Sequence, residues 1–322
     1  MAWKNNRLIT KYKQFGGWRL LREYLRLGVL PTIVRQLLRI VSTGESSKAI
    51  YPAVSRKVDP FLLNKYGDLM RERLSLYKGM ELQHLHRKTV WFCWLQGLEQ
   101  APDLVKACYR SQCLNLKDRT ITVITADNYK DYIDIPEDLE RKYHAGIIPH
   151  AMFSDLIRLE LLIKHGGTWI DSTVLCTGDR YPAKVLDGDL FLMQYRDNEG
   201  RLTGYSNWFI TSMTNHPVLM TLRDVLYQYW RDYDCVLEYY IFHLFFEEMA
   251  RYQPSEMKEM PRNNNYLTLQ LGNRIGDDYD EKWMQELLSR CCFHKLNYRV
   301  GKKVTSNRNS FYHEIINRYL EH

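Results

Sequence analysis

Apolar and polar residues follow one another in blocks that predict helices and strands. Between residues 153 and 165, apolar side chains recur three and four positions apart, which predicts a helix. Gly166 and Gly167 come next, and glycine commonly ends a helix because it adopts the left-handed conformation without strain. Residues 168–170 favour a strand, and Asp171 follows at once. The pattern therefore predicts a helix, a tight turn and a strand with a carboxylate at its exit.

The preceding part of the chain predicts a strand–helix–strand unit. Residues 88–97 and 120–125 are β-prone, and residues 102–114 between them have a helical pattern. The first run lacks apolar–polar alternation, as expected of a strand buried on both faces in a parallel sheet. We therefore expect an α/β fold with a βαβ unit. Later elements are predicted in the same way, with strands at 190–193 and 207–211 and helices at 218–230 and 236–250.

The amino-terminal segment carries the basic character of the chain. The net charge is +7, yet residues 1–41 alone hold nine basic side chains and one acid. Residues 17–41 predict two short helices broken near Gly28 and Pro31, the second with one apolar stripe. Such a basic amphipathic segment either lies on an anionic membrane surface or packs on the rest of the protein, and the sequence leaves both readings open. Residues 42–62, rich in Gly, Ser and Pro, are expected to form a linker, and residues 63–80 a helix.

These patterns divide the chain into a basic helical extension with its linker at residues 1–80 and an α/β domain at residues 81–322. The seven cysteines form no CxxC pair, which favours a reducing compartment. No secretory signal and no apolar run of about 18 residues is visible. We therefore expect a cytoplasmic protein, and residues 17–41 are its candidate segment for peripheral contact with the inner face of the membrane. Nothing points to a nucleic-acid partner.

Candidate chemistry centres on Asp171 and on the helix before it. Open α/β sheets bind ligands at the carboxyl ends of their strands, where Asp171 is expected. Asp155 and Arg158 lie three positions apart and so share one helix face. A plain structural reading is a surface ion pair beside a strand-end cap. The chain has no GxGxxG, GxxxxGK[ST] or GxSxG motif, which disfavours a dinucleotide dehydrogenase, a P-loop kinase and an α/β-hydrolase.

The spaced pattern Ser-Asp-x-x-Arg followed by Gly-Gly-x-Trp-x-Asp-x-Thr resembles that of capsular polysaccharide synthesis proteins, which are similar to the DxD glycosyltransferases that include family 32. The resemblance implies a GT-A-like, Rossmann-type sheet, flanked by helices, that binds a nucleotide-sugar. It assigns Asp155 and Arg158 to the donor sugar, and Asp171 and Ser172 to the donor nucleotide. Asp171 and Thr173 would hold Mn²⁺ or Mg²⁺, although Thr173 stands where the motif has a second carboxylate.

The resemblance extends to two further regions. Trp-x-x-Trp-x-Gln-Gly matches the family's opening motif, which implies that Trp94 stacks on the donor base and that Gln96 lies beside it. The alternative is that Trp94 is a core residue, as we expect of Trp91. Family members also carry an aromatic helix with a histidine, here His243. That histidine is either a catalytic group or a hydrogen-bonded core residue.

The implied activity is a hexosyltransferase-like transfer of a sugar from a nucleotide-sugar, with a UDP-sugar as first choice, to a glycan or lipid-linked glycan acceptor. The relation to family 32 implies retention at the anomeric carbon. Thr173 keeps a second hypothesis open, a non-catalytic membrane-associated scaffold with a degenerate transferase fold.

Overall fold

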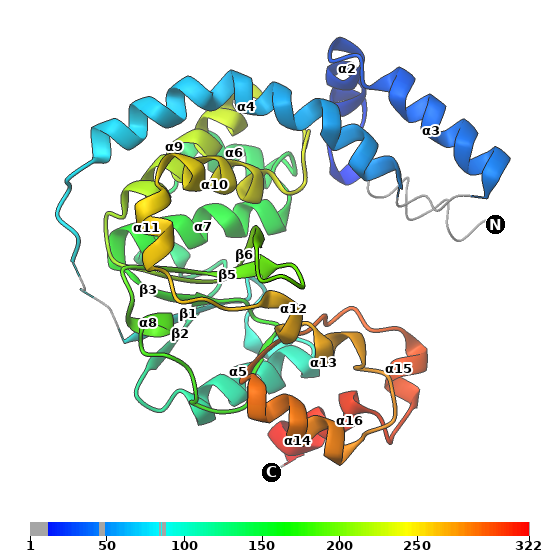
Figure 1. Ribbon diagram of the computed structural model, residues 1–322, viewed down its shortest axis with the longest axis vertical. Helices are drawn as coiled ribbons and strands as arrows, with labels where there is room; N and C mark the ends of the chain where they lie inside the picture. Colours follow the sequence, from blue (N-terminus) through cyan, green and yellow to red (C-terminus); the bar gives the residue numbers. More distant parts are fainter. Residues whose placement is uncertain (1–11, 45–48, 84, 86–87, 322) are drawn as a thin grey trace. The chain divides into compact units, whose positions relative to one another are not determined.

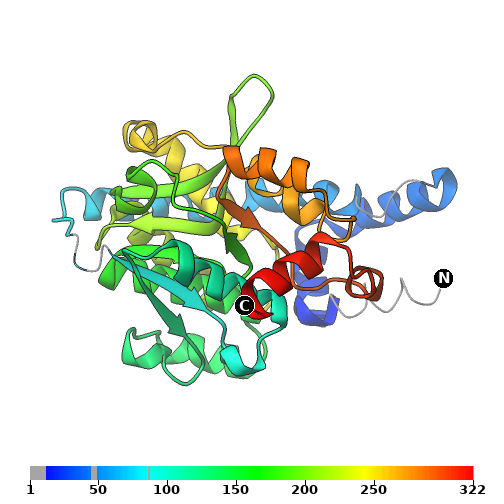
Figure 2. The ribbon, with the colours of Figure 1, turned by 90° about the horizontal axis from the view of Figure 1, so that it is seen from below.

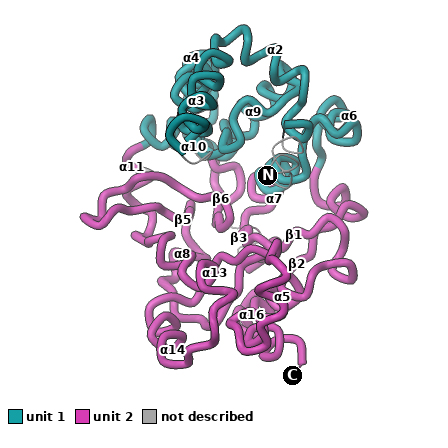
Figure 3. Tube along the Cα trace, turned by 90° about the vertical axis from the view of Figure 1, so that its right-hand side faces the viewer, with its two compact units in different colours: residues 1–80, 134–160, 217–253 teal, residues 81–133, 161–216, 254–322 magenta. Residues whose placement is uncertain are grey.

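A computed structural model describes residues 12–44, 49–83, 85 and 88–321 (Figure 1). The chain divides into two compact units, coloured separately in Figure 3. Unit 1 comprises residues 1–80, 134–160 and 217–253, and unit 2 comprises residues 81–133, 161–216 and 254–322. The predicted boundary at residue 80 coincides with the end of the first segment of unit 1. Two later segments also belong to that unit, so the functional division at this boundary stays a prediction.

Unit 1 is built on a long helix, α4 (Ile50–Tyr77), which packs against α9 (Pro217–Asp232) and α10 (Ile241–Tyr252). Every fourth residue of α4 is buried, because that spacing keeps the side chains on one face. Tyr66 in this row makes edge contacts with Tyr229 and Phe245. The buried row comprises Val54, Val58, Leu62, Tyr66, Met70 and Leu74.

The linker expected at residues 42–62 is wrong from residue 50 onward, where α4 begins. Pro52 lies in the first turn of this helix, where its missing N–H costs nothing. Pro60 lies inside the helix on an exposed face and removes one backbone hydrogen bond. Burial of the apolar row on the opposite side outweighs that loss, so the proline content misled the sequence-based prediction.

The remaining helices of unit 1 follow the predicted pattern with shifted ends. The two amino-terminal helices are α2 (Trp18–Arg26) and α3 (Leu30–Thr43), and α3 packs on α4. The helix predicted at 236–250 begins only at Ile241. Unit 1 also contains α6 (Glu137–His144) and residues 150–160 of α7 (His150–His165), whose last five residues belong to unit 2. Within the described residues, no helix combines the length and apolar character needed to cross a bilayer.

Unit 2 contains a five-stranded mixed sheet in the order β2-β1-β3-β6-β5. Parallel pairing joins β2 to β1 and β1 to β3, whereas β6 runs antiparallel to β3 and to β5. The predicted βαβ unit is confirmed, with α5 (Asp103–Asn115) between the first two strands. The loop between β5 and β6 extends beyond the sheet (Figure 2). The strands are β1 (Thr89–Cys93), β2 (Thr120–Ile124), β3 (Gly167–Ile170), β5 (Leu190–Arg196) and β6 (Leu202–Ser212).

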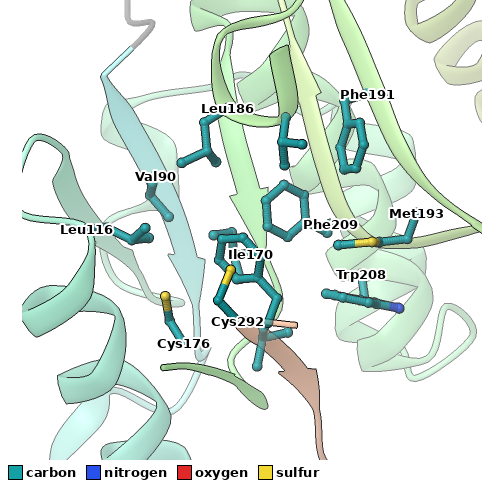
Figure 4. Packing of buried hydrophobic residues seen from close by; sticks show 13 residues of the cluster. Val90, Leu116, Ile170, Cys176, Leu186, Phe191, Met193, Trp208, Phe209 and Cys292 are labelled. Carbon is teal, nitrogen blue, oxygen red and sulfur yellow. The ribbon is translucent and has the colours of Figure 1, made fainter. Parts of the chain in front are cut away.

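A small second sheet completes the core of unit 2. It pairs β4 (Val174–Cys176) with β7 (Phe293–Lys295) in antiparallel fashion. Figure 4 shows the buried cluster in which Ile170 and Phe209 of the large sheet meet Cys176 of the small sheet and Cys292, which immediately precedes β7. The carboxyl-terminal helices pack around α5 and β4 and bury Phe311. The other helices are α8 (Lys184–Asp187), α11 (Pro254–Glu259), α12 (Asn265–Thr268), α13 (Gln270–Asn273), α14 (Glu281–Arg290), α15 (Lys302–Ser306) and α16 (Phe311–Ile316). The predicted α/β class, with helices beside a sheet and an amino-terminal helical extension, is confirmed.

Candidate functional site

The glycine pair before β3 has the conformation that the sequence predicts. Gly166 and Gly167 have φ values of 69° and 87°, a region that side chains rarely adopt. A Cβ at Gly166 would also lie 3.0 Å from the carbonyl oxygen of Ser212. The turn therefore requires glycine, and it places β3 beside β1 in parallel register. Asp171 after β3 and Trp94 after β1 consequently lie at the same carboxyl edge of the sheet.

Both carboxylate oxygens of Asp171 have partners in unit 2. Trp169 donates its indole N–H to Oδ1 at 2.8 Å, and the Lys295 ammonium lies 3.1 Å from Oδ2. The same ammonium donates to the hydroxyl of Thr173. About a quarter of the side chains of Asp171 and Lys295 remains exposed. The carboxylate is thus held in one orientation while still reachable from solvent.

Lys295 is a site residue that the sequence did not reveal. Strand pairing places it opposite Val174, and the backbone N–H of Leu296 donates to the carbonyl of Thr173 at 2.8 Å. Lysine is common on protein surfaces, and β7 is only three residues long. No signal in the sequence links a lysine in such a strand to a carboxylate far earlier in the chain. Only the pairing of β4 with β7 brings the two together.

Trp94 is half-buried, which is compatible both with stacking on a donor base and with a core role. Its ring packs against the cluster around Phe92, and Tyr298 meets it edge-on at 5.2 Å between centroids. The Arg299 guanidinium lies 5.5 Å from the Tyr298 ring. Trp91, by contrast, is buried and donates its indole N–H to the carbonyl of Gly166 at 2.8 Å, which confirms its core role.

The remaining predicted residues of unit 2 flank this edge of the sheet. Gln96 is exposed in the turn after β1, and Ser172 is half-buried beside Asp171. Thr173 is buried, and its hydroxyl is engaged by Lys295. The structure therefore brings Asp171, Thr173 and the missed Lys295 into direct contact. Trp94 is connected to the same carboxyl-terminal segment through Tyr298, three residues after Lys295.

Unit 1 holds a second group of predicted residues. Arg158 is 4% exposed and donates to Oδ1 of Asp155 at 2.7 Å, as their helical spacing predicts. Its guanidinium also lies 5.8 Å from the ring centre of Phe242 on α10. His243 is the next residue and contacts the ring of Tyr240 at 5.5 Å. Asp155, Arg158 and Phe242 thus form one contact group to which His243 is directly adjacent in sequence.

The predicted site residues are divided between the two units. Asp155, Arg158 and His243 belong to unit 1. The others belong to unit 2, namely Trp94, Gln96, Asp171, Ser172 and Thr173. Each group has the internal contacts described above. That both groups share one donor pocket stays a prediction.

The residues of the DxD position do not fit a divalent cation. Mg²⁺ and Mn²⁺ prefer oxygen ligands, and the oxygens expected to serve, on Asp171 and Thr173, already face the Lys295 ammonium. Within the part of the chain that the structure describes, no group of three or more His, Cys, Asp or Glu side chains could hold a metal ion.

Burial lowers the pKa of His294 to about 4 and raises that of Cys292 to about 12. Both are therefore neutral core groups near neutral pH.

Comparison with known proteins agrees with the sequence pattern. Residues 39–315 match the family model for capsular polysaccharide synthesis proteins. None of the curated proteins compared with the chain matches it. Among solved structures, the chain is similar to PaToxG glycosyltransferase (13% identity, 81% of this chain and 96% of that one, TM-score 0.36). It is also similar to the catalytic domain of alpha-toxin from Clostridium novyi (12% identity, 77% and 78%, TM-score 0.30).

The two structural likenesses are too low to assign an activity. The family match, in contrast, extends over most of the sequence and includes both groups of predicted site residues. The chain belongs to the capsular polysaccharide synthesis protein family.

Proposed function

We propose that this protein transfers a sugar from a nucleotide-sugar, a UDP-sugar in the first instance, to a glycan or lipid-linked glycan acceptor in surface polysaccharide synthesis. The observation that carries the proposal is the setting of Asp171 at the carboxyl edge of β3. Trp169 and Lys295 fix its carboxylate, and Trp94 lies at the same edge after β1. Open α/β sheets bind ligands at this edge. Family membership and a GT-A-like arrangement of the sheet support the same activity.

The reaction has a defined electrostatic demand. The bond between the anomeric carbon and the diphosphate oxygen breaks, and its electron pair stays on that oxygen. The acceptor hydroxyl oxygen forms the new bond to the anomeric carbon, and its proton passes to a base, which is either a protein side chain or the leaving diphosphate. Negative charge therefore grows at the leaving phosphate, where a preplaced cation stabilises the transition state. Arg158 and Asp155 are suited to the donor sugar, because guanidinium and carboxylate form charge-assisted hydrogen bonds to hydroxyl groups.

His243 enters the proposal with a more limited role. It follows Phe242, which contacts the Arg158 guanidinium, so it belongs to the same part of unit 1. An imidazole there can accept the acceptor proton. A hydrogen-bonded core role remains the alternative, and His243→Ala tests it. A catalytic role requires loss of transfer with unchanged thermal stability.

A screen of nucleotide-sugars tests the proposed activity. Thermal shift with UDP-, GDP- and CMP-sugars identifies a ligand, because binding to the folded state alone raises its apparent stability. Release of free sugar and nucleotide from that ligand then tests for turnover. Slow release supports a transferase, since water replaces the acceptor. Binding without any turnover, with or without candidate glycan acceptors, favours the non-catalytic scaffold.

We also propose that α2 and α3 attach the protein to an anionic membrane surface. Val34, Leu37, Leu38 and Val41 form a stripe along α3, here called the α3 stripe, and all four are exposed. Gln36 on the opposite side is buried, and α3 packs on α4. The α3 stripe is therefore exposed and faces away from the packing contact with α4.

The charges near the α3 stripe suit an anionic lipid surface. Arg35 and Arg39 flank the stripe and are exposed, and α2 adds three exposed arginines together with Trp18 at 81% exposure. Basic side chains attract anionic headgroups while apolar and aromatic ones enter the interface. We expect co-sedimentation with vesicles of phosphatidylglycerol and phosphatidylcholine that weakens in 0.5 M salt.

A double variant in the α3 stripe gives the decisive comparison. Leu37→Ser with Leu38→Ser should reduce vesicle binding several-fold, since both side chains are expected to insert. Leu114→Ser is the matched control, because Leu114 is equally exposed but lies on α5 in unit 2. Equal binding by the double variant and the control would contradict membrane attachment through α3.

A further inference from the structure

We propose that Lys295 takes the place of a divalent metal ion at this site and binds the donor diphosphate directly, so that the protein uses its donor without metal. This inference rests on the proposed function. The chain departs from the DxD pattern at position 173. Thr173 replaces a carboxylate there, and its hydroxyl accepts a hydrogen bond from the Lys295 ammonium.

The contacts of Lys295 reproduce those that a bridging cation would make on the protein side. Its ammonium lies 3.1 Å from Oδ2 of Asp171 and bonds the hydroxyl of Thr173. An ammonium group has three hydrogens to donate. Among the described residues, the Thr173 hydroxyl accepts a hydrogen bond from it and Asp171 faces it as an ion pair, so the ammonium keeps donor capacity for a phosphate oxygen. About a quarter of the Lys295 side chain is exposed, so a ligand can reach it.

The replacement at position 173 is consistent with this exchange of one cation for another. A second carboxylate would give the site two negative charges, which suits a doubly charged metal ion. A hydroxyl accepts a hydrogen bond without adding charge. Asp171 alone then balances Lys295, and the pair is electrically neutral before the donor arrives. Lysine is a common phosphate ligand that acts as a point charge.

The segment after Lys295 is rich in basic residues. Residues 295–310 contain five basic side chains and no acidic one. Arg299 lies over the ring of Tyr298, which contacts Trp94 edge-on. Of these cations, Lys295 contacts Asp171, and Arg299 lies beside the tyrosine that contacts Trp94, the residue expected to hold the donor base. The basic residues are Lys295, Arg299, Lys302, Lys303 and Arg308.

Calorimetric titration of UDP, GDP and CDP into the full chain, in EDTA and in Mn²⁺, tests the inference without relying on activity. We expect the preferred diphosphate to bind with the same Kd, within about twofold, in both conditions. Lys295→Met should weaken binding in EDTA by about 10- to 100-fold, the loss expected for one charge-assisted hydrogen bond. Lys295→Arg should retain most of the affinity, because it keeps the charge. Lys295→Gln provides a second neutral variant should the methionine variant unfold.

Lys88→Ala is the matched control. Lys88 pairs with Asp118 at 2.6 Å before the first two strands, at the opposite edge of the same sheet. The control should leave diphosphate binding unchanged. Equal loss in the control and in Lys295→Met would mean that any lysine–aspartate pair of this unit affects binding indirectly, which overturns the inference.

A double variant sharpens the test. Thr173→Asp with Lys295→Ala restores a carboxylate at the third DxD position and removes the ammonium. We expect its diphosphate binding to become dependent on Mn²⁺, with at least a 10-fold difference between Mn²⁺ and EDTA. If the wild-type protein itself loses binding in EDTA, the inference fails while the proposed transferase function stands. If no diphosphate binds in either condition, both fail.

Discussion

The two aspartate–cation pairs of the predicted site differ in how the fold creates them. Asp155 and Arg158 are three residues apart on one helix, and the arginine is almost fully buried. Asp171 and Lys295 come from distant parts of the chain, and both remain partly exposed. The first pair follows from helical spacing alone, whereas the second requires β4 to pair with β7. The local pair fixes the position of a side chain on its helix, and we infer that the long-range pair at the sheet edge determines which ligand the site can bind.

Removal of either member of the buried pair should produce the largest effects on stability. Asp155→Ala leaves the Arg158 charge buried without this partner, and loss of one member of a buried ion pair typically costs about 3–5 kcal/mol. Asp155→Asn keeps an acceptor for the guanidinium and should cost less. Thermal unfolding of the two variants checks the order. Equal stability of Asp155→Ala and wild type would show that the pair does not contribute to the stability of the fold.

The same pair should also matter for transfer. Asp155→Asn should reduce kcat/KM by about 10- to 100-fold if the carboxylate accepts bonds from the donor sugar. Its stability, measured in parallel, separates this loss from unfolding. Full activity of a folded Asp155→Asn variant would remove Asp155 from the donor site.

Trp94 gives an intermediate effect and tests the sheet edge that contains Asp171. Trp94→Ala should mainly raise the donor KM, by about 10-fold or somewhat more, because stacking on a base stabilises ground and transition states alike. Its ring also contacts Tyr298, so Trp94→Phe is the control that keeps most of the packing. An unchanged KM in the alanine variant would favour the core reading of this residue.

Asp59 on α4 provides a contrast to these two aspartate–cation pairs, because its neighbour is another acid, Glu238. Burial, followed by the nearby charge of Glu238, raises the pKa of Asp59 to about 7. Glu238 is itself buried and accepts hydrogen bonds from Ser55 and from the backbone N–H of Tyr240. A carboxyl group with a higher pKa in the folded chain binds its proton more tightly there. Its contribution to stability is therefore complete below about pH 4 and is lost as the pH rises through 7.

Asp59 should consequently produce the smallest change, visible only as a pH dependence. The melting temperature should fall by no more than about 3 °C between pH 6 and pH 8, and Asp59→Asn should flatten that fall. Asp68→Asn is the control, because Asp68 lies on the same helix with an exposed side chain. An unchanged slope in Asp59→Asn would show that another group is responsible.

These contrasts also explain what the sequence could predict. The β1–α5–β2 unit, the glycine turn and the Asp155–Arg158 contact depend on residues close in sequence, and all are confirmed. The helix across residues 50–62 was missed because local proline content gives no information about the buried row that stabilises it. Lys295 was missed because neither its residue type nor its short strand marks it. Its role arises only from long-range strand pairing.

The departure at Thr173 was visible in the sequence, but its meaning was not. A missing carboxylate can indicate a degenerate site or a site with another cation. The contact of Thr173 with Lys295 is the observation from which we infer the second. The chemistry of a substituted motif position thus depends on its spatial neighbours, and those neighbours lie beyond the motif.

The most direct measurement compares the rate of nucleotide-sugar cleavage by wild type, Asp171→Asn and Asp118→Asn. Asp118 is the matched aspartate, since it also pairs with a lysine in unit 2 but at the other edge of the sheet. We predict that Asp171→Asn lowers the rate by about 100-fold or more, because the substitution removes the charge that positions Lys295 at the leaving phosphate, and that Asp118→Asn cleaves the donor at the wild-type rate. Equal rates for wild type and Asp171→Asn would contradict a transferase site at the end of β3.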